Sequence, residues 1–238
     1  ALPDFSKWGE VEVRPMSNIR RKTAEHLSVA WQAPHVTQHD QADVTALEEF
    51  RRTYGPRVEK AGGKLTVTAI VIRILASAIA KYPQFASSVD MANDAVVFKK
   101  YIHIGVAVDT PNGLLVPVMR DVDRKTITEI AVELAQLSQK ARDKKLTLEE
   151  MAGGVISVTN LGGIGGTAFT PIINQPEVAI LGLSRAATAP VWKGTGFVPR
   201  ELLPLSLSYD HHVIDGADAA RFLRFVAEAL EQPLSMHL

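Results

Sequence analysis

The chain has 238 residues, of which 46% are hydrophobic and 22% charged, values ordinary for a globular protein. Lys and Arg together number 26, as do Asp and Glu, so the net charge is zero. This balance gives no support for a basic surface that would bind nucleic acid or a membrane. The chain has no cysteine, which excludes disulfides, thiolate metal sites and a cysteine nucleophile.

The most apolar stretch, residues 65–80, is too short to span a bilayer and contains Arg73, which predicts a buried helix. No charged region followed by an apolar one opens the chain, so no signal peptide is predicted. The start at Ala1 rather than Met indicates a fragment or a processed product. The absence of cysteine fits a reducing compartment.

The chain opens with an irregular arm over residues 1–16 that ends in a short predicted strand. Apolar periodicity and polar caps predict helices that begin at Ser17, at Thr45, at Thr66 or Thr68, at Thr126 and near Asp218. Alternating apolar residues predict strands at 35–45, 95–98, 102–108, 114–119, 155–158, 178–183 and 203–209, with a hairpin at 191–197. Because strands and helices mix throughout, we expect one α/β domain over residues 17–238, with a mixed β-sheet flanked by helices.

The strongest local motif is SYDHHVIDG at residues 208–216. If the preceding strand continues, His211 lies on the apolar face and His212 on the polar one, so at most one of them enters a given site. A buried histidine is kept neutral by desolvation and can accept a proton. Asp215 would orient the backbone or form a buried ion pair. The spacing alone favours a core histidine before a turn, and adjacent histidines on opposite faces cannot share one metal ion, so no metal site is expected.

The second motif is the glycine-rich segment TNLGGIGGTAF at residues 159–169. It lacks the Gly-Lys-Ser/Thr ending of a phosphate-binding P-loop, and its glycines do not match a dinucleotide-binding loop. Flexible packing and close approach of the backbone to a ligand both remain open. Thr159, at the start of the segment, offers a hydroxyl donor.

Three long segments carry a family resemblance: HIGVAVDTPNGLLVPV, VTNLGGIGGTAFTPIINQPEVAILG and SYDHHVIDG. Together they resemble the catalytic domain of the dihydrolipoamide acyltransferases, a family that shares its fold and mechanism with chloramphenicol acetyltransferase. The match runs from about Val13 to Leu238. The part GGTAFTPIINQPEVAILG is more similar to the acetyl-transferring pyruvate dehydrogenase type than to the succinyl type.

The resemblance implies a coenzyme A-dependent acyltransferase fold and transfer of an acetyl group between coenzyme A and a dihydrolipoyl thiol. His211 would be the general base, and a neutral imidazole suits a thiol whose pKa is roughly 8.5. Thr159 aligns with the family hydroxyl that donates to the oxyanion. Asp215 aligns with an aspartate that pairs with a buried arginine, here Arg20 or Arg21, and so organises the site.

For coenzyme A, the resemblance implies Arg51 as a phosphate ligand and Asp109 as an acceptor for the pantetheine or adenine end. A plain surface charge is the alternative interpretation of Arg51. Gly165 and Gly166 would let the backbone approach the pantetheine arm. His212 stands where the family usually has arginine, and we assign it no chemistry.

The resemblance also implies homotrimers that join into a cubic or dodecahedral core, with His211 and Thr159 of each site supplied by neighbouring subunits. The implied partners are a lipoyl domain, pyruvate dehydrogenase and dihydrolipoamide dehydrogenase, and a bacterial cytoplasm is expected in preference to a mitochondrial matrix. The apolar tail at residues 233–238 would anchor in a neighbour's pocket or fold onto its own subunit. Two alternatives stay open: a succinyl or branched-chain acyltransferase, and a non-catalytic homologue that only builds the core.

Overall fold

The computed structural model describes residues 2–111 and 113–232, so the tail at 233–238 lies outside the described residues. The helices are α1 (Asn18–Ala30), α2 (Thr45–Lys60), α3 (Val67–Lys81), α4 (Ile127–Arg142) and α5 (Gly216–Glu231), with 3-10 turns η1 (Phe5–Lys7), η2 (Pro83–Ala86), η3 (Val122–Arg124) and η4 (Glu149–Met151). The strands are β1 (His35–Asp43), β2 (Ser87–Asp90), β3 (Ala95–Phe98), β4 (Ile104–Val106), β5 (Val108–Thr110), β6 (Gly113–Leu115), β7 (Val118–Met119), β8 (Ile156–Asn160), β9 (Ala179–Leu183), β10 (Ala187–Trp192) and β11 (Phe197–Asp210).

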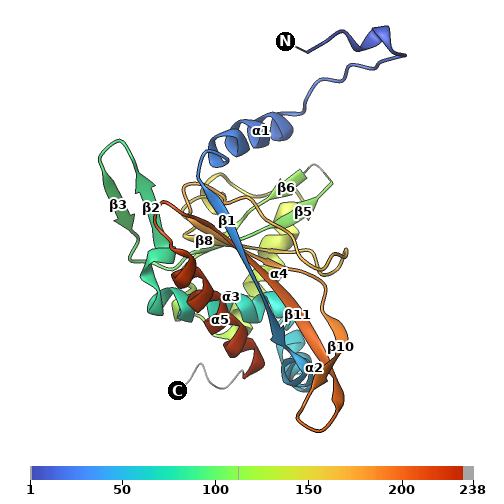
Figure 1. Ribbon diagram of the computed structural model, residues 1–238, viewed down its shortest axis with the longest axis vertical. Helices are drawn as coiled ribbons and strands as arrows, with labels where there is room; N and C mark the ends of the chain where they lie inside the picture. Colours follow the sequence, from blue (N-terminus) through green and yellow to red (C-terminus); the bar gives the residue numbers. More distant parts are fainter. Residues whose placement is uncertain (1, 112, 233–238) are drawn as a thin grey trace.

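Seven strands form the main sheet, in the order β1-β11-β9-β8-β4-β7, with β10 paired to the outer part of β11. β8 runs parallel to β4 and β9, whereas the other pairs are antiparallel, so the sheet is mixed. β2 with β3 and β5 with β6 make two separate hairpins. In Figure 1, α1 and the N-terminal arm extend away from the body formed by the sheet and its helices. The expected α/β fold is confirmed.

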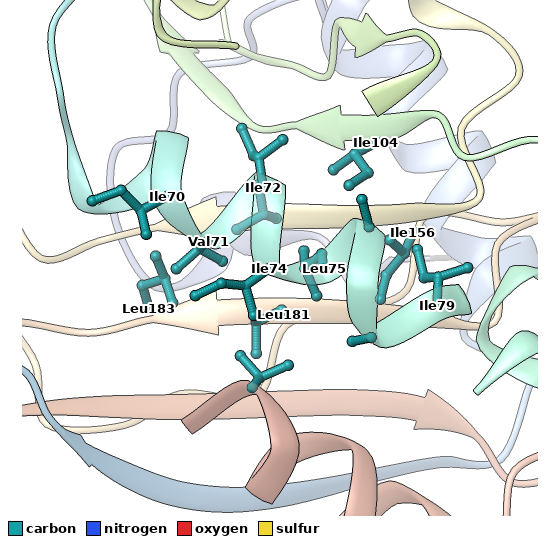
Figure 2. Packing of buried hydrophobic residues seen from close by; sticks show 14 of the residues in the cluster. Ile70, Val71, Ile72, Ile74, Leu75, Ile79, Ile104, Ile156, Leu181 and Leu183 are labelled. Atoms are coloured by element: carbon teal, nitrogen blue, oxygen red, sulfur yellow. The ribbon is translucent and has the colours of Figure 1, made fainter. Parts of the chain in front are cut away.

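α3 is the central helix of the core. The Thr66 hydroxyl accepts a hydrogen bond from the Ala69 N–H and so caps the helix, which confirms one of the two predicted starts. Nine of its fifteen residues are buried, because the helix packs against α4, α5 and β8. Figure 2 shows Ile70, Val71, Ile74 and Leu75 beside Leu181 and Leu183 of β9 and Ile156 of β8. An isoleucine- and alanine-rich helix without charge on most sides is stable only when it is buried in this way.

Other helix starts follow local capping chemistry. Ser17 caps α1, as predicted, and Thr126 with Glu129 forms a complete capping box at α4. Thr45 was expected to be a cap but is the first residue of α2. Its hydroxyl donates instead to Asp43 Oδ1 at 2.7 Å, and it accepts from the Glu201 N–H at 2.9 Å, which ties α2 to β11.

Several strand predictions need correction. Residues 102–108 and 114–119 do not form two long strands, because Pro117 has no N–H to donate and β5 and β6 leave the main sheet to pair with each other. The strand predicted at 203–209 is part of the fourteen-residue β11. No strand is found over residues 2–16, where the only regular element is the turn η1. Within the described ranges, no helix is long and apolar enough to cross a membrane.

Candidate active site

His211 lies in the turn after β11, at one end of the main sheet. β11 ends at Asp210, whose carbonyl accepts from the N–H groups of Val213 and Ile214 and so closes a turn. The strand therefore does not continue through the two histidines, and the expected burial of His211 is wrong for the single chain, in which its side chain is exposed. The His211 N–H donates to Pro34 O at 3.0 Å, and its ring lies 5.7 Å from that of Tyr209.

The side chain of His212 contacts Asp210. Its Nδ1 lies 2.8 Å from Asp210 Oδ1, which also accepts from the His212 N–H at 2.9 Å. Asp210 is buried, so these two contacts replace hydrogen bonds that its carboxylate would otherwise make to water. We interpret His212 as a structural residue of the turn.

Asp215 is exposed and lies directly before α5. Burial of Tyr209 and, secondarily, the charge of Asp215 raise the pKa of the Tyr209 phenol, which indicates that the two residues are near each other. Arg20 and Arg21 lie on an exposed part of α1, where Arg21 contacts Asn18. Over residues 2–111 and 113–232, no ion pair joins Asp215 to either arginine, so the single chain does not bring the predicted pair together.

Thr159 lies near the end of β8, on the wall of a cavity of about 530 Å³. Ser157 and Thr159 face this cavity, whereas Ile156 and Val158 face the core, as strand alternation requires. α1 and the long segment between β8 and β9 complete the wall, which is mostly apolar and includes Phe169. The Thr159 hydroxyl makes no hydrogen bond in the part of the chain that the structure describes, so it is available to a bound molecule.

A second groove of about 420 Å³ lies on the opposite side of β8. Asn160 lines this groove, whereas its neighbour Thr159 lines the cavity, and Ala107 contributes to both. The groove also contains Asp109, one of the residues that the sequence singled out. The cavity and the groove therefore lie on opposite sides of β8, next to Thr159, the candidate hydroxyl donor.

Arg51 does not line the groove. Its Nε donates to Leu65 O at 2.9 Å and its Nη1 to the Glu48 carboxylate, so the guanidinium joins α2 to the segment before α3. The cations that do line the groove are Lys64 and Arg142. Sequence reasoning missed both of them, because neither belongs to a motif and each resembles an ordinary surface charge.

Gly165 and Gly166 adopt φ values of +149° and +89°, a backbone conformation that favours glycine. No atom lies within 4 Å of a Cβ built at either position, so the space on that side of both residues is open. Neither residue lines the cavity or the groove. Elsewhere too, the described ranges contain no group of three or more side chains suited to hold a metal ion.

His211 and Thr159 of one chain lie far apart. Thr159 pairs with Gly182, and Gly182 with Ser206, so Thr159 is level with Ser206 across β9. His211 follows five residues after Ser206, which places it roughly 17 Å along the strand and two strand spacings to the side, a separation of the order of 19 Å. One chain therefore does not bring the candidate base and the candidate hydroxyl donor together.

The sequence pattern described as 2-oxoacid dehydrogenases acyltransferase (catalytic domain) matches residues 9–238. The chain belongs to this family. It is 53% identical over 228 residues to the dihydrolipoyllysine-residue acetyltransferase component of the pyruvate dehydrogenase complex of Pseudomonas aeruginosa, covering 95% of this chain and 42% of that protein. The corresponding component of Azotobacter vinelandii is 51% identical over 95% of this chain and 36% of its own length. The chain thus spans about two fifths of the length of these relatives.

Solved structures of the family superpose on nearly the whole chain. One is the Azotobacter vinelandii dihydrolipoamide acetyltransferase, studied for the role of a serine, a histidine and an asparagine in its catalytic mechanism; its TM-score is 0.97 at 49% identity, covering 100% of this chain and 98% of that chain. The cubic core of a pyruvate dehydrogenase multienzyme complex also gives 0.97, at 48% identity and the same coverage. Chloramphenicol acetyltransferase, at 15% identity, gives 0.56 over 87% of this chain and 94% of its own, which confirms the expected fold relationship.

Proposed function

We propose that the chain is the catalytic domain of an acetyltransferase that moves an acetyl group between coenzyme A and a dihydrolipoyl thiol. The proposal rests on one observation above all. The serine, histidine and asparagine studied in the Azotobacter vinelandii enzyme have the same spacing along the chain as Thr159, His211 and Asp215 here. Threonine keeps the hydroxyl of serine, and aspartate keeps the size of asparagine while adding a charge.

The reaction follows from the chemistry of two of these side chains. The neutral His211 imidazole takes the proton of the attacking thiol as its sulfur bonds to the thioester carbonyl carbon. The carbonyl oxygen becomes negative, and the Thr159 hydroxyl donates a hydrogen bond to it. The intermediate then collapses and expels the other thiolate, which takes the proton back from the imidazolium. The acetyl group never bonds to the protein.

The two hollows beside β8 suit the two substrates. We assign the apolar cavity to the dihydrolipoyl chain and the groove to coenzyme A, with the two thiols meeting at Thr159, near the end of β8. In the groove, Lys64 and Arg142 are the proposed phosphate ligands and Asp109 a hydrogen-bond acceptor. Arg51 would have to exchange its contact with Glu48 to reach a phosphate, and Gly165 and Gly166 remain proposed backbone contacts to the pantetheine arm.

The separation of His211 and Thr159 within one chain supports a site shared between chains. We propose homotrimers in which His211 of one subunit meets Thr159 of the next, and in which Asp215 pairs with Arg20 or Arg21. The likeness to the cubic pyruvate dehydrogenase core supports cubic assembly of these trimers. Lipoyl domains, pyruvate dehydrogenase and dihydrolipoamide dehydrogenase are the proposed partners, and the bacterial relatives support a cytoplasmic location.

The test is transfer of acetyl from acetyl-CoA to dihydrolipoamide by the assembled protein. We expect His211→Ala to lower kcat by about 10²–10⁴-fold, because the general base is lost. Thr159→Ala is expected to lower it about 10²–10³-fold, whereas Thr159→Ser, which keeps the hydroxyl, stays close to the unchanged protein. Unchanged activity in His211→Ala would exclude His211 as the base. Faster transfer from succinyl-CoA or a branched acyl-CoA would replace acetyl as the proposed group.

A further inference from the structure

A line of hydrogen bonds begins in the wall of the apolar cavity and leads to a buried carboxyl. Asn174 is at its centre: its Oδ1 lies 3.1 Å from His26 Nε2, and its Nδ2 donates to Glu177 Oε1 at 3.2 Å. His26 belongs to α1, whereas Asn174 and Glu177 belong to the segment before β9. Both His26 and Asn174 line the cavity that also contains Thr159. The line therefore connects a buried carboxyl to the cavity that we assign to the dihydrolipoyl chain, which we call the acceptor site.

The partners fix the direction of these bonds. Oε1 of Glu177 accepts, so the amide nitrogen of Asn174 must face it and the amide oxygen must face His26. An amide oxygen only accepts, so the Nε2 of His26 carries the hydrogen. In a neutral imidazole, Nδ1 is then the acceptor. Glu177 thus sets both the tautomer and the orientation of the His26 ring.

The buried Glu177 carboxyl makes fewer hydrogen bonds than it could. It is 3% exposed, and its Oε2 has no hydrogen-bond partner in the described part of the chain. The buried hydroxyl of Ser157, which also lines the cavity, makes no hydrogen bond of good geometry there either, but it lies close enough to Glu177 to lower the pKa of that carboxyl. A Cβ on Gly154 would come within 2.5 Å of Glu177 Oε1, so the chain leaves room for this carboxyl. A buried carboxyl whose partners are one amide and one poorly aligned hydroxyl is uncommon in a protein interior, which favours a role beyond packing.

We propose that Glu177 is a positioning residue of the acceptor site, which through Asn174 holds His26 so that its Nδ1 accepts a hydrogen bond from the dihydrolipoyl substrate. This role rests on the proposed function and on the assignment of the apolar cavity to the dihydrolipoyl chain. The amide N–H and the second thiol of that substrate are the groups able to donate. His26 contributes to binding of the acceptor and takes no part in the transfer step itself.

Steady-state kinetics of the assembled protein, with each substrate varied separately, tests this role. Glu177→Met and Asn174→Ala should raise the KM for dihydrolipoamide by about 5- to 10-fold, the effect of one lost hydrogen bond, while kcat and the KM for acetyl-CoA stay within about twofold. Glu177→Gln is the matched control. It keeps an accepting oxygen for Asn174 and supplies an N–H toward Ser157, so its KM should stay within about twofold of the unchanged protein.

His26→Ala provides a second route, because His26 is exposed and its loss does not disturb the core. It should raise the same KM by a similar factor, and adding it to Asn174→Ala should change little more, because both substitutions break one line. A loss confined to kcat, an equal rise in both KM values, or a Glu177→Gln variant as impaired as Glu177→Met would overturn the positioning role. No acetyl transfer by the unchanged protein would contradict the proposed function itself, which distinguishes the two failures.

Discussion

Glu177 has an energetic consequence that does not depend on any substrate. Burial raises the pKa of its carboxyl from 4.5 to about 7, although contacts with Ser157 and Asn174 and the charge of Lys99 act in the opposite direction. Between about pH 4.5 and pH 7, Glu177 is therefore protonated in the folded chain but ionised in the unfolded chain. Because each unit of pKa shift corresponds to about 1.4 kcal/mol, ionising Glu177 costs the folded state on the order of 3 kcal/mol.

We predict that the free energy of unfolding falls as the pH rises from 5 to 8, and that Glu177→Gln removes on the order of 3 kcal/mol of that fall per chain. Denaturant unfolding at several pH values, at one fixed protein concentration, measures this difference. The matched comparison is Glu150→Gln, because Glu150 is a partly exposed acid whose pKa is lowered by Lys140 and Thr147. Parallel pH profiles for the unchanged protein and Glu177→Gln would contradict the assignment.

Residue roles could be predicted from the sequence only where a motif carried them. His211 and Thr159 lie in motifs long enough to identify a family, and their positions followed from that resemblance. The contact between His26 and Asn174 joins residues 148 positions apart, and no local pattern indicates it. The exposure of His211 was missed for a related reason. Hydrogen bonds to Asp210 O end the strand there, and an alternating pattern carries no information on such a turn.

The segment between β8 and β9 makes one very close contact with the sheet. The Phe169 ring lies over Gly182 of β9, where an added Cβ would come within 2.5 Å of the ring. Phe169 also lines the apolar cavity, so a shift of its ring would change the shape of the cavity wall.

We predict that Gly182→Ala destabilises the protein by about 1–3 kcal/mol, the usual effect of overpacking, and raises the KM for dihydrolipoamide. Thermal or denaturant unfolding gives the first value and steady-state kinetics the second. Adding Phe169→Leu should recover part of the stability, because a shorter side chain makes room for the methyl group. A Gly182→Ala protein with unchanged stability would mean that the ring moves aside at no energetic expense.

Among the helices and strands, the boundaries that could be predicted from the sequence were those set by contacts within a few residues. The starts of α1, α3 and α4 were predicted because the capping hydroxyls of Ser17, Thr66 and Thr126 act within their own first turn. The breaks in the strands depend on which neighbour each strand finds. β5 pairs with β6 outside the main sheet, and β7 begins after Pro117. The alternation of apolar residues predicts neither of these breaks.

For the whole molecule, the sequence predicted the fold class and the family, whereas the arrangement of the cavity and groove on either side of β8 needed the structure. A shared site has a consequence that mutation of one residue alone does not reveal. His211→Ala chains still carry Thr159, and Thr159→Ala chains still carry His211.

We predict that two inactive variants complement each other. In trimers assembled at random from equal amounts of His211→Ala and Thr159→Ala chains, about a quarter of the sites, one half times one half, receive both intact residues. Co-expressed chains should therefore recover about a quarter of the activity of the unchanged protein, measured as acetyl transfer. If trimers that are shown separately to contain both chains have no activity, the whole site lies within one chain.

The distance of roughly 19 Å between the His211 turn and Thr159 also implies that folding and the gain of activity are separate steps. On the proposed mechanism, a newly made chain folds before it can react, and it becomes reactive only when it meets its neighbours. Acetyl-CoA bound by an unassembled chain meets no base, so stray chains do not waste thioester by hydrolysis. Transfer activity then reports how much of the protein has assembled, and dilution below the association range should silence it while leaving every chain folded.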